Sequence, residues 1–244
     1  MILTSISDII SKYHSFFTRG LLYTILLAVL GTAGGFLLAL PFLGIKTTKI
    51  DPIRDSKVSI FIKKVGIGFT NVYTTFFRGT PMMVQAMIFY YGMSLVIHNV
   101  SGNNYWWKPI IAGIIVIIIN TSAYIIEILR GAVNAIDPGQ MEAARSLGFS
   151  RKKALYLIIY PQAIKNALPS IGNEFIVNLK DSSVLSVIGI FDLFKATGSV
   201  VSTTADSVTP YIITAILYLT LTSITALLVK KLESKRHGGE MKNV

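Results

Sequence analysis

The chain has 244 residues, of which 52% are hydrophobic and only 14% are charged, and its formal net charge is +11. Because an ordinary soluble domain carries roughly a quarter charged residues, this composition excludes that class and indicates an integral membrane protein. The chain has no cysteine and only three scattered histidines, which excludes a disulfide framework, a thiolate nucleophile and a Cys-based metal site.

Five long apolar runs predict five transmembrane helices, since roughly 20 apolar residues span the hydrocarbon core of a bilayer. The first run is too long for the core of a cleaved signal peptide and is not followed by an Ala-x-Ala site. The fourth is interrupted by prolines and charged residues, so we expect a span that is modified for function. The runs comprise residues 21–45, 79–107, 109–126, 154–191 and 207–229.

Two segments beside these spans, residues 1–18 and 56–77, have apolar residues at helical spacing against charged ones. This pattern is typical of a helix that lies on the membrane surface, and the end of a tilted span gives the same pattern. Trp106 and Trp107, next to Lys108, are typical of the aromatic belt at the outer membrane boundary.

Lysine and arginine are concentrated between the first and second spans, between the third and fourth, and after the fifth, whereas the other two connections contain one lysine each. By the positive-inside rule, the amino terminus lies outside and the carboxyl terminus inside. Residues 137–153 are then cytoplasmic. The net charge reflects this topology, and we exclude nucleic acid as a partner.

Residues 137–153 predict a helical hairpin. Asp137 followed by proline is a start signal, Gly148 suits the positive φ that ends a helix, and the serine two residues later can cap the next helix. The adjacent alanines at positions 143 and 144 would let another protein approach the backbone closely. From spacing alone, the hairpin is either a docking element for a soluble partner or a connecting loop without one.

The stretch Glu142-Ala143-Ala144, with Gly148 and then Pro161-Gln162-Ala163 beyond it, resembles the EAA loop of permease subunits in ABC-type importers. Further stretches between Phe77 and Ile190 are similar, in the same order, to the polar amino-acid permeases. Ser182 stands where a threonine is expected, and the basic stretch 46–64 is longer than usual. The further stretches are Phe77-Arg78-Gly79-Thr80-Pro81, Val84-Gln85, Tyr90-Tyr91-Gly92, 123–131 and 179–185.

The resemblance implies an all-α integral membrane protein with five transmembrane helices and a cytoplasmic coupling-helix hairpin, the type I ABC importer permease fold. Residues 1–244 would form a single domain. Within it we expect an interfacial N-terminal helix over 1–18, a transmembrane core over 19–232 with the coupling loop 137–153, and a cytoplasmic tail over 233–244.

The resemblance also implies the function of a permease subunit in an ATP-driven amino-acid importer of the bacterial cytoplasmic membrane. The chain would not be an enzyme and would hold no cofactor, because a separate ATPase dimer binds ATP and magnesium. The sequence lacks the Gly-x-x-x-x-Gly-Lys-Ser/Thr phosphate loop. The other expected partners are a second, identical or homologous permease subunit, an extracytoplasmic solute-binding protein, the amino acid and membrane lipid.

The ATPase-coupling residues implied by the resemblance lie in the hairpin. Glu142 would pair with a basic residue of the ATPase, Ala143 and Ala144 would allow close packing, and Gly148 would make the bend. Gly148→Asp should uncouple transport from ATP hydrolysis, because it adds a side chain and a charge at a turn that we expect to be tightly packed and strained.

Ionisable side chains within a span cost several kcal/mol and mark a pathway or an ion pair. In one interpretation Lys180 pairs with Asp181 or Glu174 and stabilises broken helix ends. In the other, a set of polar and methionine side chains lines a central cavity for an amino acid. That substrate-pathway set comprises Glu127, Met83, Met87, Asn173, Asn178, Lys180, Asp181 and Ser182.

Two other functions remain open. The same architecture could import another small solute, which competition with amino acids in a transport assay would reveal. The chain could also be a channel or membrane scaffold without ATP coupling. Co-purification of an ATPase that is lost when Glu142 or Gly148 is mutated would exclude this function. An intramembrane enzyme is disfavoured, because the sequence shows no Ser/His pair, paired acids or metal-ligand spacing.

Overall fold

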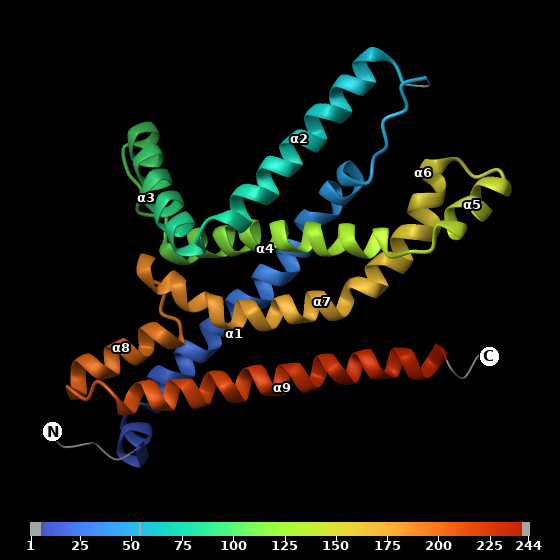
Figure 1. Ribbon diagram of the computed structural model, residues 1–244. Helices are drawn as coiled ribbons and strands as arrows, with labels where there is room; N and C mark the ends of the chain where they lie inside the picture. Colours follow the sequence, from blue (N-terminus) through green and yellow to red (C-terminus); the bar gives the residue numbers. More distant parts are fainter. Residues whose placement is uncertain (1–5, 54, 241–244) are drawn as a thin grey trace.

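The computed structural model describes residues 6–53 and 55–240, and every regular element in this part is a helix. Figure 1 shows α4, α7 and α9 lying side by side, with α1 crossing them diagonally and a small hairpin projecting at one end. The elements are α1 (Ile6–Lys46), α2 (Lys57–Gly79), α3 (Met82–Ser101), α4 (Pro109–Asn134), α5 (Pro138–Ser146), α6 (Arg151–Ala154), the π-helical turn η1 (Leu155–Ile159), α7 (Tyr160–Asp181), the 3₁₀ segment η2 (Ser182–Ile188), α8 (Leu193–Thr204) and α9 (Thr209–Glu240).

Helix α1 is continuous over 41 residues, about 60 Å at 1.5 Å per residue, which is roughly twice the thickness of the hydrocarbon core. Residues 6–18 form the first turns of α1, so of the two interpretations of this segment the structure favours the end of the first span over a separate surface helix. Here the apolar side of α1 packs on α8 and α9. The cluster comprises Ile9, Tyr13, Phe17, Leu193, Val200 and Ile213.

The most extensive helix packing is that of α1 on α4. Three glycines on α1, Gly31, Gly34 and Gly35, bring the backbones close together. A β-carbon at Gly31 would lie 2.8 Å from Cγ1 of Ile117, and one at Gly35 would lie 3.0 Å from Cβ of Thr121. Small residues at such crossings let membrane helices approach closely.

Gly31→Ala should destabilise the chain by about 1–3 kcal/mol through overpacking against α4, measured as a lower unfolding temperature in detergent. Gly92→Ala on α3 is the matched control, because no heavy atom lies within 4 Å of a β-carbon at Gly92. Alanine should raise helix stability there by about 1 kcal/mol. Equal unfolding temperatures for the two variants would contradict this packing.

Helices α2 and α3 meet beside the centre of α4. The Tyr73 hydroxyl donates to the Ile119 carbonyl at 2.9 Å, and the Asn120 amide donates to the Phe77 carbonyl at 3.1 Å. Because these partners lie in the middle of α4, the second half of α2 lies inside the span. Of the two interpretations of 56–77, the contacts favour the end of a tilted span over a surface helix.

The break between α2 and α3 is closed by side-chain amides. Gln85 donates to the carbonyls of Phe77 and Thr80 at 3.0 Å each and to the Thr80 hydroxyl at 2.8 Å. The Asn120 side-chain amide donates to the side-chain oxygen Oε1 of Gln85 at 3.0 Å. A broken helix is tolerated within a membrane only where its freed backbone groups find such partners.

Residues after the hairpin form the modified span that the sequence predicted. The π-helical turn η1 ends two residues before Pro161. Proline has no backbone N–H to donate, and its ring clashes with the carbonyl four residues earlier, so the helix widens at this point. The helix then tightens into η2 and ends at Gly189, which has a φ of +94°. The next helix, α8, lies in a region where the sequence predicted only a connection.

Four helices, α1, α3, α4 and α9, are long and apolar enough to cross a membrane, and the segment from α6 to η2 makes a fifth together with α8, at a bend of 55°. This agrees with the five predicted spans by length and composition. The hairpin and the described end of α9 lie at one end of the molecule, and the start of α1 lies at the other (Figure 1). Residues 1–5 and 241–244 of the predicted terminal segments lie outside the described part.

Trp107 is buried rather than part of the aromatic belt. Its indole nitrogen donates to the Tyr90 carbonyl at 2.9 Å, and its ring packs edge-on against Phe89. Trp106 is 48% exposed and stays available for the membrane boundary. The pattern of two tryptophans next to a lysine therefore predicts the belt position for only one of them.

Candidate functional site: a projecting hairpin and an intramembrane polar stripe

The hairpin forms through the local signals that predicted it. The Asp137 carboxylate accepts a hydrogen bond from the Gly139 backbone N–H at 2.8 Å. At the end of α5, the Phe149 N–H donates to the Ala144 carbonyl at 3.1 Å and the N–H of Gly148 to the Arg145 carbonyl at 3.0 Å. This pair of bonds is a Schellman ending, and it requires the φ of +84° that this glycine adopts.

The hairpin has an inner and an outer side. Ala144 is buried, because α5 packs on α6 and η1, so its small side chain serves packing within the chain rather than contact with a partner. Glu142 and Ala143 are exposed, and Leu147 is 79% exposed. The exposed side of α5 therefore offers an acid, a small residue and an apolar residue together.

Gly148 has open space around it, contrary to the expectation of a tightly packed turn. No heavy atom of the described chain lies within 4 Å of a β-carbon at this position. The demand for glycine comes from the backbone, because residues with a β-carbon rarely adopt a positive φ.

A polar stripe runs along the exposed side of α7. Its members recur at helical spacing and are Ser170, Asn173, Lys180 and Asp181. The depth of the stripe in the membrane follows from its neighbour on α7, Asn178, whose side-chain oxygen accepts a hydrogen bond from the Thr121 hydroxyl at 3.0 Å. Because Thr121 lies at the centre of α4, Lys180 and Asp181 also lie near the middle of the span.

Two of the predicted pathway residues face the inside of the chain. Asn178 is 3% exposed and also donates to the Thr32 hydroxyl at 2.8 Å, so it joins α7 to α1 and α4. Ser182 is fully buried, and its hydroxyl donates to the Leu179 carbonyl at 3.1 Å. Both positions are therefore filled by contacts within the chain and do not reach the stripe.

Glu127 lies apart from the polar stripe and is held in ion pairs. Its carboxylate accepts from Lys46 at 2.8 Å and from Arg130 at 2.7 Å, and Lys46 also donates to Asn71 at 2.8 Å. This network fastens the end of α1 to α4 and α2. The geometry thus favours a structural role for Glu127 over contact with substrate.

Glu127→Gln should lower the free energy of unfolding by roughly 1.5–3 kcal/mol, because it weakens hydrogen bonds to charged groups and leaves Lys46 with less compensation. Substrate preference in an uptake assay should stay the same once the amount of folded protein is matched. A changed substrate preference with an unchanged free energy of unfolding would show that Glu127 contacts the substrate.

The predicted pairing of Lys180 with Asp181 or Glu174 does not form a salt bridge in the described part of the chain. Glu174 is partly buried beside the stripe, and the charges that act on its carboxyl are those of Asp181 and Arg78. Arg78 comes from the last turn of α2 and lies over the ring of Tyr124, 5.5 Å from its centroid.

Sequence reasoning missed Arg78 as a site residue, although it lies within a stretch that resembles the family. The signal that could have found it is a lone arginine directly before the Gly-Thr-Pro break of a span. Met83 and Met87 on α3 are 43% and 40% exposed, so both remain available to line a pathway. Among the described residues, no group of three or more potential metal ligands occurs.

An all-helical, multi-pass membrane fold, an exposed polar stripe inside it and a hairpin projecting from one end define a membrane permease. The family model described as the binding-protein-dependent transport system inner membrane component matches residues 58–238. The chain belongs to this family. It is a translocation subunit of an ABC importer rather than an enzyme, and such a subunit works with a solute-binding protein and a separate ATPase.

Two curated relatives cover most of the chain. The arginine transport system permease protein ArtQ of Bacillus subtilis is 35% identical over 179 residues, which are 73% of this chain and 78% of that protein. The glutamine transport system permease protein GlnP of Escherichia coli K12 is 30% identical over 217 residues, which are 89% of this chain and 91% of that protein.

Two solved structures share the fold. The crystal structure of an amino acid ABC transporter with histidines is 36% identical, with a TM-score of 0.78, and the match covers 96% of this chain and all of that chain. The methionine ABC transporter MetNI in an inward-facing form is 16% identical, with a TM-score of 0.68 over 90% of this chain and 95% of that chain. Together they confirm the type I importer permease fold.

Proposed function

We propose that this chain is the permease subunit of an ATP-driven importer for amino acids in a bacterial cytoplasmic membrane. Two permease subunits, identical or homologous, form the translocation pathway, and this chain supplies half of it. The relatives whose names include arginine and glutamine support an amino acid as the substrate.

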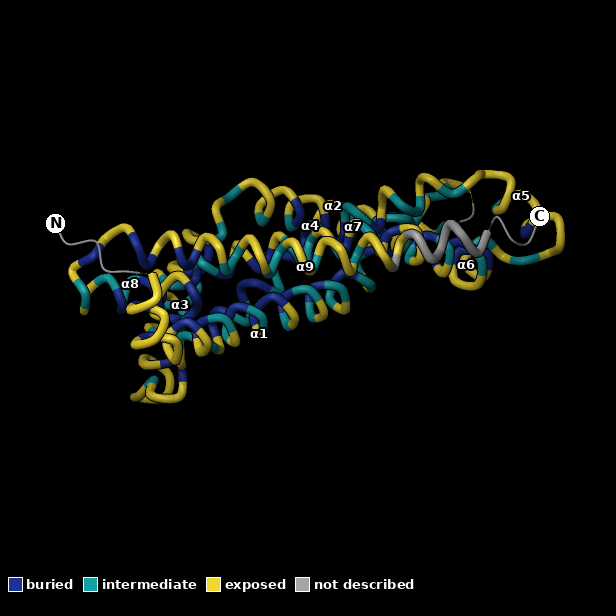
Figure 2. The backbone as a smooth tube through the Cα atoms, turned by 90° about the horizontal axis from the view of Figure 1, so that it is seen from below, coloured by how far each residue is buried: buried dark blue, intermediate teal, exposed yellow. Residues whose placement is uncertain are grey.

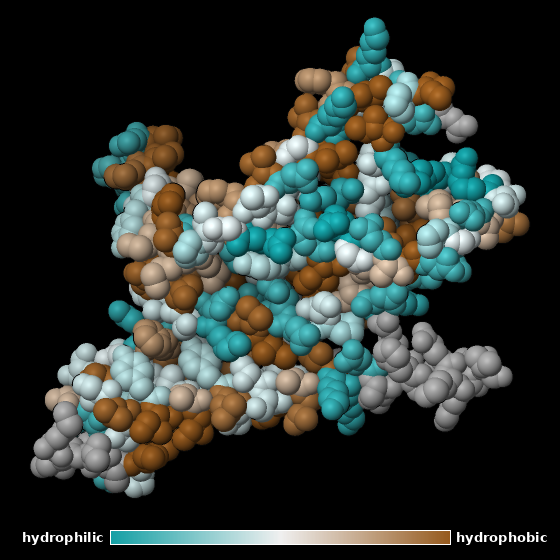
Figure 3. Space-filling model, viewed as in Figure 1, coloured by the Kyte–Doolittle hydropathy of each residue, from teal (hydrophilic) through white to brown (hydrophobic). Residues whose placement is uncertain are grey.

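The observation that carries the proposal is the exposure of the polar stripe in the middle of a membrane span. Lys180 and Asp181 are exposed in the single chain, although charged groups facing lipid at that depth cost several kcal/mol. Figure 3 shows hydrophilic surface gathered over the middle of one face, across α4 and α7, between more hydrophobic surfaces. A second permease subunit facing the stripe would enclose it in a water-filled pathway.

The chemistry of the stripe suits an amino acid. Asp181 and Glu174 can accept hydrogen bonds from an ammonium group, and Lys180 and Arg78 can donate to a carboxylate. Charged groups of both signs thus match the two ends of a zwitterion. Met83 and Met87 supply flexible apolar surface that adapts to different side chains.

The hairpin is the proposed contact with the ATPase. Glu142 pairs with a basic residue of the ATPase, and Ala143 and Leu147 pack on its surface. The ATPase dimer, which binds ATP and magnesium, then lies on the cytoplasmic side with the carboxyl terminus of this chain. The amino terminus faces outside, where the solute-binding protein docks; the concentration of lysine and arginine near the hairpin supports this orientation.

The proposal is tested by reconstituting this chain with its ATPase and binding protein in proteoliposomes. We expect ATP-dependent uptake of radiolabelled arginine or glutamine that unlabelled amino acids inhibit. Uptake that only a dipeptide, an osmolyte or an oxyanion inhibits would overturn the substrate class. Uptake at the same rate without ATP would overturn the coupling to an ATPase.

A further inference from the structure

A basic pocket lies beside the hairpin, outside the polar stripe. It has a volume of about 520 Å³ and lies between the end of α1, the first turns of α2 and the α6–η1 segment. Its size is within the range of ligand pockets. The lining residues are Pro41, Gly44, Ile45, Thr48, Lys49, Lys63, Arg151, Lys152, Leu155, Tyr156 and Tyr160.

The polar lining is strongly basic. Four of the lining residues are lysine or arginine, and none is an acid. Lys63 is held by Asp55, whose carboxylate accepts from it at 2.5 Å and whose pKa is lowered by that hydrogen bond. For Lys49, Arg151 and Lys152, no carboxylate lies within salt-bridge distance in residues 6–53 and 55–240.

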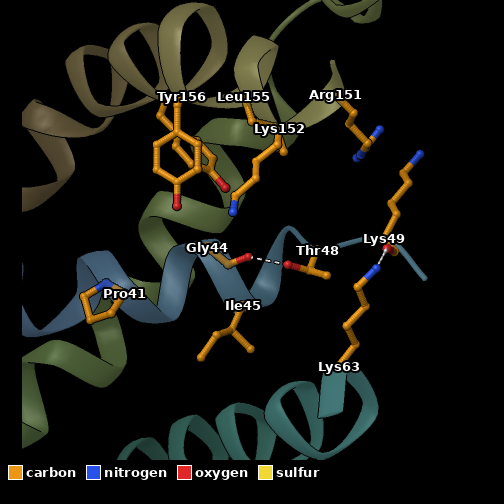
Figure 4. Close-up of a pocket in the computed structure, with 11 residues that line it drawn as sticks. Pro41, Gly44, Ile45, Thr48, Lys49, Lys63, Arg151, Lys152, Leu155 and Tyr156 are labelled. Atoms are coloured by element: carbon orange, nitrogen blue, oxygen red, sulfur yellow. Dashed lines mark hydrogen bonds between the residues drawn. The ribbon is translucent and has the colours of Figure 1, made fainter. Parts of the chain in front are cut away.

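Three of the four basic side chains gather at one end of the pocket, whereas Lys152 points toward Gly44 and Tyr156 (Figure 4). Figure 4 shows the ends of Lys49 and Arg151 pointing toward each other, and Lys63 reaching toward Lys49 from the other side. Lys63 donates to the Lys49 carbonyl at 3.3 Å, which holds the two side by side. Because like charges repel, the facing ends of Lys49 and Arg151 favour an anion between them.

The remaining lining is apolar or aromatic. Tyr156 is 57% exposed and points into the pocket above Gly44 (Figure 4), and Pro41, Ile45 and Leu155 complete this side. Next to it, α2 exposes a row of large apolar residues, which continues the apolar surface along the membrane. The row comprises Phe61, Ile62, Val65, Phe69, Val72 and Phe76. Figure 2 colours exposed residues yellow along the backbone.

We propose that this pocket binds an anionic phospholipid of the inner leaflet, with the headgroup phosphate between Lys49 and Arg151, Lys152 adding positive charge on the side of Tyr156, and an acyl chain along Ile45 and Tyr156. Basic pockets between transmembrane helices on the cytoplasmic side are suited to such headgroups. A soluble anion would use the basic residues but would leave the apolar side and the row on α2 without a partner. The inference rests on the orientation given under the proposed function.

The bound lipid would add a second connection between two parts of the chain that the hydrogen bond between the Thr47 and Tyr160 hydroxyls already joins. Lys49 lies in the connection between α1 and α2, whereas Arg151 and Lys152 begin α6, directly after the hairpin. One phosphate that bridges Lys49 and Arg151 ties the first span to the element that contacts the ATPase. Inner-leaflet composition would then influence how the hairpin transmits the ATPase cycle.

The test measures binding of a fluorescent, short-chain phosphatidylglycerol to the purified importer complex in a neutral detergent. The pocket variant Lys49→Gln/Arg151→Gln/Lys152→Gln should bind at least about tenfold more weakly than the wild type, since each basic residue contributes to attraction of an anionic lipid. The control variant Lys57→Gln/Lys64→Gln/Lys230→Gln removes three exposed charges outside the pocket and should bind as the wild type does.

Several results would overturn the inference. Equal loss of binding in both variants would mean that total charge, and not the pocket, attracts the lipid. Competition by phosphatidylcholine, or by inorganic phosphate as effective as the lipid, would show that no anionic lipid is recognised. Loss of the ATPase from the pocket variant with unchanged lipid binding would assign these residues to the ATPase interface. Because binding is measured without transport, a failure here is distinguishable from a failure of amino-acid uptake.

Discussion

Gly148→Val should abolish ATP-driven uptake while the chain still inserts and pairs in the membrane. Gly148 has a φ of +84°, where a β-branched residue is a conformational outlier. The Schellman ending of α5 would therefore open, and the exposed side of the hairpin would turn away from the ATPase. Uptake and ATP hydrolysis are measured together in proteoliposomes, and we expect hydrolysis to continue without transport.

A series at Gly148 separates the causes. Asparagine tolerates positive φ better than other residues with a β-carbon, so Gly148→Asn should retain most of the uptake. Gly148→Asp has nearly the same shape as Gly148→Asn and adds a charge. A loss of uptake in Gly148→Asp that Gly148→Asn does not show would therefore come from repulsion between this charge and the ATPase surface. The space around Gly148 in this chain is open, so intrachain clash does not contribute. Full activity of Gly148→Val would contradict the coupling role of the turn.

Asp181→Asn and Lys180→Gln should each reduce uptake by about ten- to a hundredfold. Each removes a hydrogen bond to a charged group of the substrate, worth roughly 1.5–3 kcal/mol. Both side chains are exposed in the single chain and lie in the polar stripe, so thermal stability should stay near that of the wild type. Uptake is measured at matched protein, and stability by thermal unfolding in detergent.

Lys57→Gln is the matched control for this pair, because it removes one exposed lysine at the start of α2 and should leave uptake unchanged. The comparison of the stripe variants with Glu127→Gln separates a transport role from a structural role. That variant is expected to lose stability and keep its substrate preference, whereas the stripe variants keep stability and lose transport. If the two classes behave alike, the polar stripe is not the pathway.

The hairpin and the spans could be predicted because their signals are local. Proline after Asp137 starts α5, and Gly148 ends it, through bonds that reach no further than five residues. The apolar runs identify spans by composition alone. The role of Ala144 could not be predicted in the same way, since the side of a short helix that packs on the chain depends on distant residues.

The pathway residues were harder to predict, because a sequence does not state which side of a helix faces a neighbour. Lys180 and Asn178 lie two residues apart on α7, yet the first is exposed and the second is buried against α1 and α4. Glu127 accepts a hydrogen bond from Lys46, which lies 81 residues earlier in the sequence. Such pairs follow from the crossing of α1 and α4, which only the structure supplies.

The central claim is that the hairpin couples this permease to a separate ATPase, and co-purification tests it most directly. The tagged wild-type chain, co-expressed with its ATPase, should retain the ATPase through purification. Glu142→Lys, which reverses an exposed charge on α5, should lose it while remaining folded and membrane-inserted. Retention of the ATPase at the wild-type level by Glu142→Lys would contradict the account.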